Sequence, residues 1–209
     1  MRVESLEKAV EALQRGLVVA APTESFFGLL ADVTSGAALS ALFTLKPRGP
    51  HQGVPILLPN RAVWSSLILE LPDLAQELAD AFWPGPLTIV LPASPQVDRR
   101  LLNAGTVAVR LPGPCLAADV VRAFGRPLTA TSANPPGATP PTRDTEVRAA
   151  FRVPVEQGRL LVAEGAAPGG QPSTLVAVEA AGLKVLREGA VTIEQLNQRF
   201  TCCVRANGF

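Results

Sequence analysis

The chain has 209 residues, of which 47% are hydrophobic and 18% charged, so it can bury a core and lacks the composition of a disordered protein. Its formal net charge is +1 and its Lys and Arg residues are scattered, which argues against a dedicated nucleic-acid binder because such proteins gather basic residues into a patch. The length favours a single domain covering residues 1–209.

Hydrophobic periodicity predicts alternating helices and strands along the chain. The expected elements, in chain order, are a helix capped by Ser5 and ended by Gly16, a strand at 17–22, a helix at 37–46 capped by Thr34 or Ser35, a strand at 54–59, a helix at 71–82, strands at 87–92 and 106–112 separated by a helical piece around 99–102, a helix at 115–125, a strand at 127–130, a helix at 142–150, short strands at 159–165, 173–179 and 183–188, and a helix at 192–200. Closely spaced short strands favour antiparallel pairing at the C-terminal end. The pattern predicts an α/β or α+β fold with a mixed sheet.

The cysteines and the apolar segments indicate whether the protein binds zinc, is secreted or spans a membrane. Cys115, Cys202 and Cys203 lack the CxxC or Cys/His spacing of a zinc site, so we expect reduced thiols and no metal centre. Residues 1–16 carry charge throughout, unlike the apolar core of a signal peptide, and no apolar run reaches the length of a membrane span. We therefore expect a soluble, cytoplasmic protein with no membrane partner.

A nucleotide site, if present, must be built without the usual glycine-rich loops. Neither a P-loop nor a GxGxxG motif occurs, so phosphates would be held by side chains and turn amides at strand ends. Lys46 and Arg48, on either side of Pro47, could supply a mobile point charge and a planar fork for phosphate. Their spacing alone favours the other interpretation, two solvated cations at the end of a helix.

Two polar loops follow expected strands. In TATSANPPG (129–137), hydroxyl and amide groups could bind a phosphate or a ribose. In PTESFFGL (22–29), Thr23, Glu24 and Ser25 follow a buried strand, with two phenylalanines able to wall a pocket. Such residues are also ordinary turn and cap formers. Taken singly, each loop favours a plain turn.

Arg110 lies within an otherwise apolar strand, where an unpaired cation is costly. Its partner is either a buried carboxylate or the carboxylate or phosphate of a ligand, and the sequence does not choose between them. Ser173 and Arg187 lie at ends of other expected strands. The lone histidine, His51, has no residue at triad or metal spacing.

The serial order of these motifs is more specific than any one of them. PTESFFGL, KPR, FWPGPLTIVLP, TVAVRLP, TATSANPPG, PSTLV and LREGAV together resemble the YrdC-like family of threonylcarbamoyl-AMP synthases, over about residues 16–191. The resemblance implies a twisted, mixed open sheet flanked by helices around a large concave cavity.

The resemblance also implies the reaction of L-threonine, bicarbonate and ATP to threonylcarbamoyl-AMP and pyrophosphate. ATP would be a substrate accompanied by Mg²⁺, with no metal bound by the protein itself. The product would pass to transferase proteins that form threonylcarbamoyladenosine at position 37 of tRNA. By the family pattern the catalytic residues would be Lys46, Arg48, Ser132 and Asn134; the ATP-binding residues Lys46, Arg48, Thr106, Ser132, Ala133, Asn134 and Arg187; and the threonine-binding residues Thr23, Arg110, Thr131 and Ser173.

The chain also departs from the family pattern. Ser25 stands for a threonine and Phe27 for a tyrosine, which is expected to remove a hydroxyl from the pocket wall and to affect threonine recognition more than nucleotide binding. Two other functions remain open: another ATP-dependent carbamoyl transferase on the same scaffold, and an RNA-binding module whose concave surface holds tRNA or rRNA.

Overall fold

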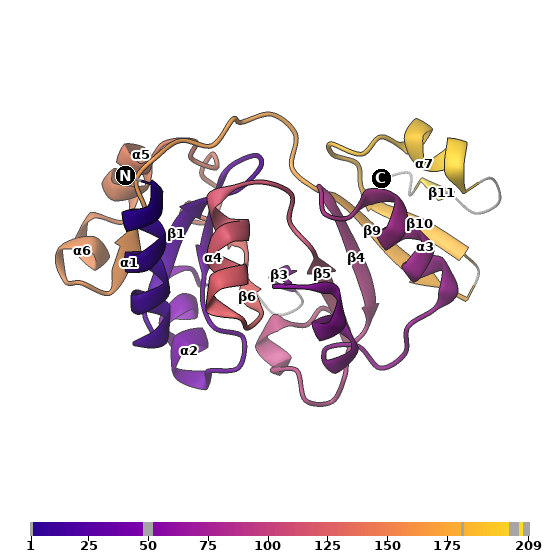
Figure 1. Cartoon of the computed structure of the whole chain (residues 1–209), viewed down its shortest axis with the longest axis horizontal. Coiled ribbons are helices and arrows are strands. Elements are labelled where there is room, and N and C mark those ends of the chain that lie inside the picture. The colour runs from indigo at the N-terminus through magenta and orange to yellow at the C-terminus, as the bar shows by residue number, and fades with distance from the viewer. Residues whose placement is uncertain (1, 48–51, 181, 201–204, 207–209) are drawn as a thin grey trace.

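The computed structural model describes residues 2–47, 52–180, 182–200 and 205–206 (Figure 1). The predictions for Arg48, His51, Cys202 and Cys203 concern residues outside these ranges. They stay predictions.

Most helices lie where the sequence places them. They are α1 (Arg2–Gln14), α2 (Gly36–Leu45), α3 (Asp73–Phe82), α4 (Leu116–Phe124), α5 (Asp144–Ala150), α6 (Arg152–Glu156) and α7 (Ile193–Arg199), with 3₁₀ turns η1 (Arg61–Ser66) and η2 (Arg99–Leu101). The Oγ of Ser35 accepts the N–H of Ala38 and caps α2, and Gly125, with a φ of 77°, ends α4. The expected cap at Ser5 is wrong, because α1 begins at Arg2. Of the helices described, none combines the length and apolar character needed to cross a bilayer.

The strands form two sheets rather than one. They are β1 (Val18–Pro22), β2 (Phe27–Leu30), β3 (Ile56–Leu57), β4 (Leu87–Pro92), β5 (Thr106–Arg110), β6 (Leu128–Thr129), β7 (Thr131–Ser132), β8 (Leu160–Val162), β9 (Thr174–Glu179), β10 (Gly182–Arg187) and β11 (Arg205–Ala206). The smaller sheet has the order β7-β2-β1-β8 and the larger the order β11-β10-β9-β4-β5-β3-β6. Both contain parallel and antiparallel pairs, which confirms the mixed α/β class.

The C-terminal strands pair only in part as expected. β9 and β10 are antiparallel neighbours, as predicted. β8 instead pairs in parallel with β1, where Val18 lies opposite Leu160. The connection 163–173 is long enough to carry the chain from the smaller sheet to the larger one, so closeness in sequence did not determine the partner of β8.

Helices cover both faces of the smaller sheet. In Figure 1, α1 and α4 lie side by side in front of β1 in the left half, while β4, β9 and β10 of the larger sheet lie in the right half beside α3. Along β1, Val19 and Ala21 pack against α1 and α4, whereas Val18 and Ala20 belong to a second cluster with α2 and α5. Every residue of β1 is buried, as its continuous apolar sequence predicts.

The segment Leu128–Ser132 joins the two sheets. β6 pairs with β3 in the larger sheet, and β7, after a single residue, pairs with β2 in the smaller one. The fully buried Thr129 strengthens this junction, because its Oγ1 accepts the N–H of Ala31 at 2.9 Å and donates to the carbonyl of Leu29 at 3.1 Å. The junction therefore fixes where the loops after β1 and β7 meet.

Thr129→Val removes both side-chain hydrogen bonds at the junction while keeping the shape of the side chain. We expect the free energy of unfolding to fall by about 1–3 kcal/mol, because the buried N–H of Ala31 loses its acceptor. Urea unfolding followed by circular dichroism measures the change. Thr44→Val is the matched control, since the Thr44 hydroxyl bonds a helix carbonyl at an exposed position; an equal loss in both variants would contradict the assignment of Thr129.

Candidate functional site

A cavity of about 660 Å³ lies between the two sheets, next to the junction. The loop after β1, the end of α2, the end of β5, the β7 segment and the loop before β9 all contribute to its wall. Most of the sequence-predicted site residues are brought together here, namely Thr23, Lys46, Arg110, Thr131, Ser132, Asn134, Ser173 and Arg187.

Lys46 holds the loop that follows β7. It lies directly after α2 and is buried, and its Nζ donates to the carbonyl of Ser132 at 2.6 Å, to Ser132 Oγ at 2.9 Å and to Asn134 Oδ1 at 3.0 Å. Asn134 in turn donates from Nδ2 to the carbonyl of Ala138. An ammonium group has three protons, so a phosphate oxygen that contacts Lys46 directly must replace one of these acceptors.

Arg110 has a carboxylate partner within the protein. Its Nη1 donates to Glu24 Oε2 at 2.9 Å, and the two side chains are 9% and 18% exposed. Glu24 Oε1 accepts the N–H of Gly113 at 2.7 Å. Of the two partners expected for Arg110, the buried carboxylate is therefore present. Arg110 also lines the cavity.

Arg187 lies at the end of β10 and reaches back to the loop before β9. Its Nη2 donates to the carbonyl of Ser173 at 2.8 Å. Although Arg187 is exposed as a residue, burial of the guanidinium, and secondly the charge of Arg110, lower its pKa. Arg187 and Arg110 are therefore close enough for their positive charges to repel each other.

The charge of the cavity wall is one-sided. Among its described lining residues, Lys46, Arg110 and Arg187 are cations and no carboxylate is present, since Glu24 approaches Arg110 from outside this wall. Hydroxyl and amide groups from Thr23, Ser132, Asn134 and other residues surround the cations. This arrangement suits a polyanionic ligand held by side chains.

Two predicted residues that the structure describes, Thr106 and Ala133, are not on this wall. Thr106 begins β5, and its Oγ1 donates to the carbonyl of Asn103 at 2.7 Å. Ala133 is fully buried between two lining residues, with its N–H donated to the carbonyl of Phe27. Arg48 lies outside the described residues.

Both departures from the family pattern lie at the wall of the cavity, because Ser25 and Phe27 are among its lining residues. The side chain of Phe27 is fully buried in the core cluster with Val18 and Ala20. The effect of these two residues on threonine recognition stays a prediction.

Thr88 was not identified from the sequence. It is 1% exposed on β4, lines the cavity, and donates from Oγ1 to Ser173 Oγ at 2.9 Å. The available signal was a polar residue within the apolar strand LTIVLP, the same reasoning that singled out Arg110. The role of Glu24 was also missed, because nothing in the sequence connects residue 24 to residue 110.

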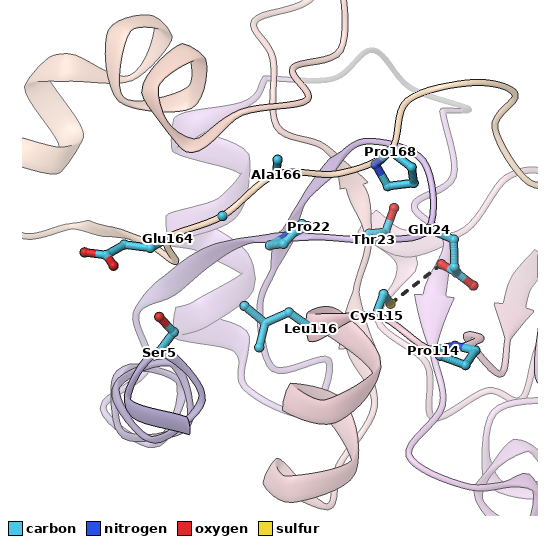
Figure 2. A pocket seen from close by; sticks show the side chains of 11 residues that line it. Ser5, Pro22, Thr23, Glu24, Pro114, Cys115, Leu116, Glu164, Ala166 and Pro168 are labelled. Carbon is cyan, nitrogen blue, oxygen red and sulfur yellow. Dashed lines mark hydrogen bonds between the residues drawn. The ribbon is translucent and has the colours of Figure 1, made fainter. Parts of the chain in front are cut away.

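A second cavity, of about 540 Å³, lies on the other side of the loop after β1. Figure 2 shows Thr23 and Glu24 on that loop, with Cys115 and Leu116 at the start of α4 beneath them. Burial, and secondly the charge of Glu24, raise the pKa of Cys115 to about 11. The thiol therefore stays protonated at neutral pH and is a poor nucleophile.

Comparisons with known proteins show the family to which the chain belongs. A family model described as "Sua5_yciO_yrdC: Telomere recombination" matches residues 11–189. A Vibrio cholerae protein named threonylcarbamoyl-AMP synthase is 35% identical over 190 residues, which are 90% of this chain and 98% of that protein. A protein of the same name from Pyrococcus abyssi is 32% identical over 201 residues, which are 94% of this chain and 58% of that protein.

Solved structures show the same fold. The crystal structure of P. abyssi Sua5 complexed with L-threonine superposes with a TM-score of 0.86 at 29% identity, covering 98% of this chain and 60% of that one. E. coli YciO superposes with a TM-score of 0.76 at 22% identity, covering 91% of each chain. With a family model that spans most of its length and relatives above 30% identity, the chain belongs to the Sua5/YciO/YrdC family.

Proposed function

We propose that the chain is a threonylcarbamoyl-AMP synthase, a nucleotidyltransferase that converts L-threonine, bicarbonate and ATP into threonylcarbamoyl-AMP, pyrophosphate and water. The main support for this proposal is the composition of the cavity wall. Lys46, Arg110 and Arg187 lie there beside hydroxyl and amide groups, and the described wall has no carboxylate. Both substrates other than bicarbonate bring anionic groups to it. The names of the V. cholerae and P. abyssi relatives support the assignment.

ATP would occupy the part of the cavity around Lys46. Lys46, Ser132 and Asn134 form one hydrogen-bonded unit, and Arg187, which lines the same cavity, would neutralise phosphate charge. Arg48 follows Lys46 in sequence and would add a planar fork. Ala133 and Thr106 remain predicted ATP contacts, Ala133 through its backbone. Mg²⁺ would enter as part of the substrate, held by the phosphates, because the described wall offers it no carboxylate.

Threonine would occupy the part around Arg110. Guanidinium and carboxylate match in geometry and charge, so Arg110 would bind the α-carboxylate. Thr23, Thr131 and Ser173 surround this place on the wall, and Thr88 fixes the hydroxyl of Ser173. The threonine complex of P. abyssi Sua5 supports an amino-acid site in this fold.

The reaction asks little of side chains as acids or bases. The threonine amine and bicarbonate give a carbamate with loss of water, and a carbamate oxygen then attacks the α-phosphorus as pyrophosphate leaves. Alignment of the two substrates and neutralisation of phosphate charge would supply most of the catalysis. The adenylate would then be used by transferase proteins that modify position 37 of tRNA.

The direct test incubates the purified chain with labelled threonine, bicarbonate and Mg²⁺-ATP. We expect pyrophosphate and a labelled threonylcarbamoyl-adenylate in equal amounts, detected by a coupled assay and by mass spectrometry. No product with threonine, together with salt-sensitive binding of RNA, would instead favour an RNA-binding module.

Lys46→Met replaces the charge with an apolar side chain of similar length. We expect pyrophosphate release to fall about a hundredfold or more, the usual cost of losing a group that stabilises transition-state charge. Lys8→Met on the exposed face of α1, where Lys8 pairs with Glu4, should leave the rate unchanged. A wild-type rate for Lys46→Met, with a normal circular dichroism spectrum, would remove Lys46 from the site.

Arg110→Lys keeps the positive charge beside Glu24 but loses the planar fork. We expect the KM for threonine to rise about tenfold, corresponding to about 1.4 kcal/mol, while the KM for ATP stays unchanged. Arg122→Lys is the control, since Arg122 forms an exposed ion pair on α4. An unaltered threonine KM would return Arg110 to a purely structural role.

A further inference from the structure

We propose that Glu24 is a positioning residue for amino-acid recognition: its carboxylate holds the guanidinium of Arg110 in the orientation that receives the substrate carboxylate. The inference rests on the proposed function, since it assigns Arg110 to threonine. It adds a residue to which neither the sequence motifs nor the comparisons give a role.

Glu24 and Arg110 come from different sheets. Glu24 follows β1 of the smaller sheet, and Arg110 ends β5 of the larger sheet, where its carbonyl accepts the N–H of Leu58 at 2.8 Å. Their 2.9 Å ion pair therefore spans the boundary beside the cavity. The position of the guanidinium depends on both sheets.

Both carboxylate oxygens of Glu24 are committed. Oε1 accepts the backbone N–H of Gly113 at 2.7 Å, and Oε2 accepts Nη1 of Arg110. A carboxylate fixed at both oxygens cannot rotate without losing a contact, so it transmits the backbone position of residue 113 to the arginine. This is tighter control than charge neutralisation alone requires.

The two cavities place Glu24 behind the guanidinium. Glu24 lines the second cavity with Cys115 and Leu116, as Figure 2 shows, whereas Arg110 lines the first. A guanidinium has five N–H donors, and the contact with Glu24 uses Nη1. A substrate carboxylate would approach from the cavity side and use other donors, so the two carboxylates do not compete for the same hydrogen bond.

Holding the arginine in place lowers the cost of binding. A free arginine side chain would lose rotamer freedom each time a substrate bound. With Glu24 in place that freedom is already lost in the folded protein. Removing the constraint should therefore weaken threonine binding and leave the nucleotide half, around Lys46, unaffected.

Two variants separate position from charge. Glu24→Gln keeps the size and removes the charge; Glu24→Asp keeps the charge but is too short to hold Gly113 and Arg110 together. For both we expect the threonine KM to rise about three- to thirtyfold, the cost of ordering one arginine side chain on binding. The ATP KM and kcat should stay within about twofold of wild type, and Glu11→Gln, at an exposed position of α1, should change nothing.

The outcomes are distinguishable. An unchanged threonine KM in both variants overturns the inference, and so does a normal value for Glu24→Asp alone, because charge would then suffice. Two outcomes would show that Glu24 has a purely structural role: loss of the folded state in both variants, or an equal rise in the threonine KM and the ATP KM. If the wild type neither releases pyrophosphate nor binds threonine in calorimetry, the proposed function itself fails.

Discussion

The structure depends on one stretch of chain that belongs to both sheets. Leu128–Thr129 pairs with β3 and Thr131–Ser132 pairs with β2, so one extended segment ends the larger sheet and begins an edge of the smaller one. Thr129 fixes it from within by bonding Leu29 and Ala31. Because Ser132 ends this segment and Asn134 follows soon after, sheet pairing rather than the loop itself sets the position of the part of the cavity around Lys46.

The cavity has a positive wall, and each of its three described cations has a partner within the protein. Lys46 donates to oxygens that carry no net charge, Arg110 shares its charge with Glu24, and Arg187 donates to a carbonyl. The three cations thus have different kinds of partner, and none of these partners places a carboxylate on the described wall. Dipoles and one carboxylate behind the wall stabilise the charges while leaving the field inside the cavity positive, which is what an anionic substrate requires.

Local structure could be read from the sequence, and contacts between distant residues could not. Ser35 as a cap, the double-sided burial of β1 and the place of Lys46 after a helix all follow from short-range patterns, and they are confirmed. Motif order predicted most of the polar residues on the cavity wall, although Thr106 and Ala133 are not on it and Thr88 was missed. The contact of Lys46 with Asn134, the pairing of Glu24 with Arg110 and the parallel partner of β8 each join segments far apart in the chain. The local sequence of each of these segments is compatible with several partner segments, so it does not determine which contact forms.

The order of strands in each sheet also determines how much of the chain must be synthesised before the sheets can be completed. β8 closes the smaller sheet beside β1, and β9 lies in the middle of the larger sheet between β4 and β10. A chain emerging from the ribosome therefore exposes the apolar edges of β1 and β4 until residues 160–179 have been synthesised. Neither sheet is complete before that point. Completing both requires late, long-range pairing, a slow kind of folding step that leaves unpaired edges open to aggregation.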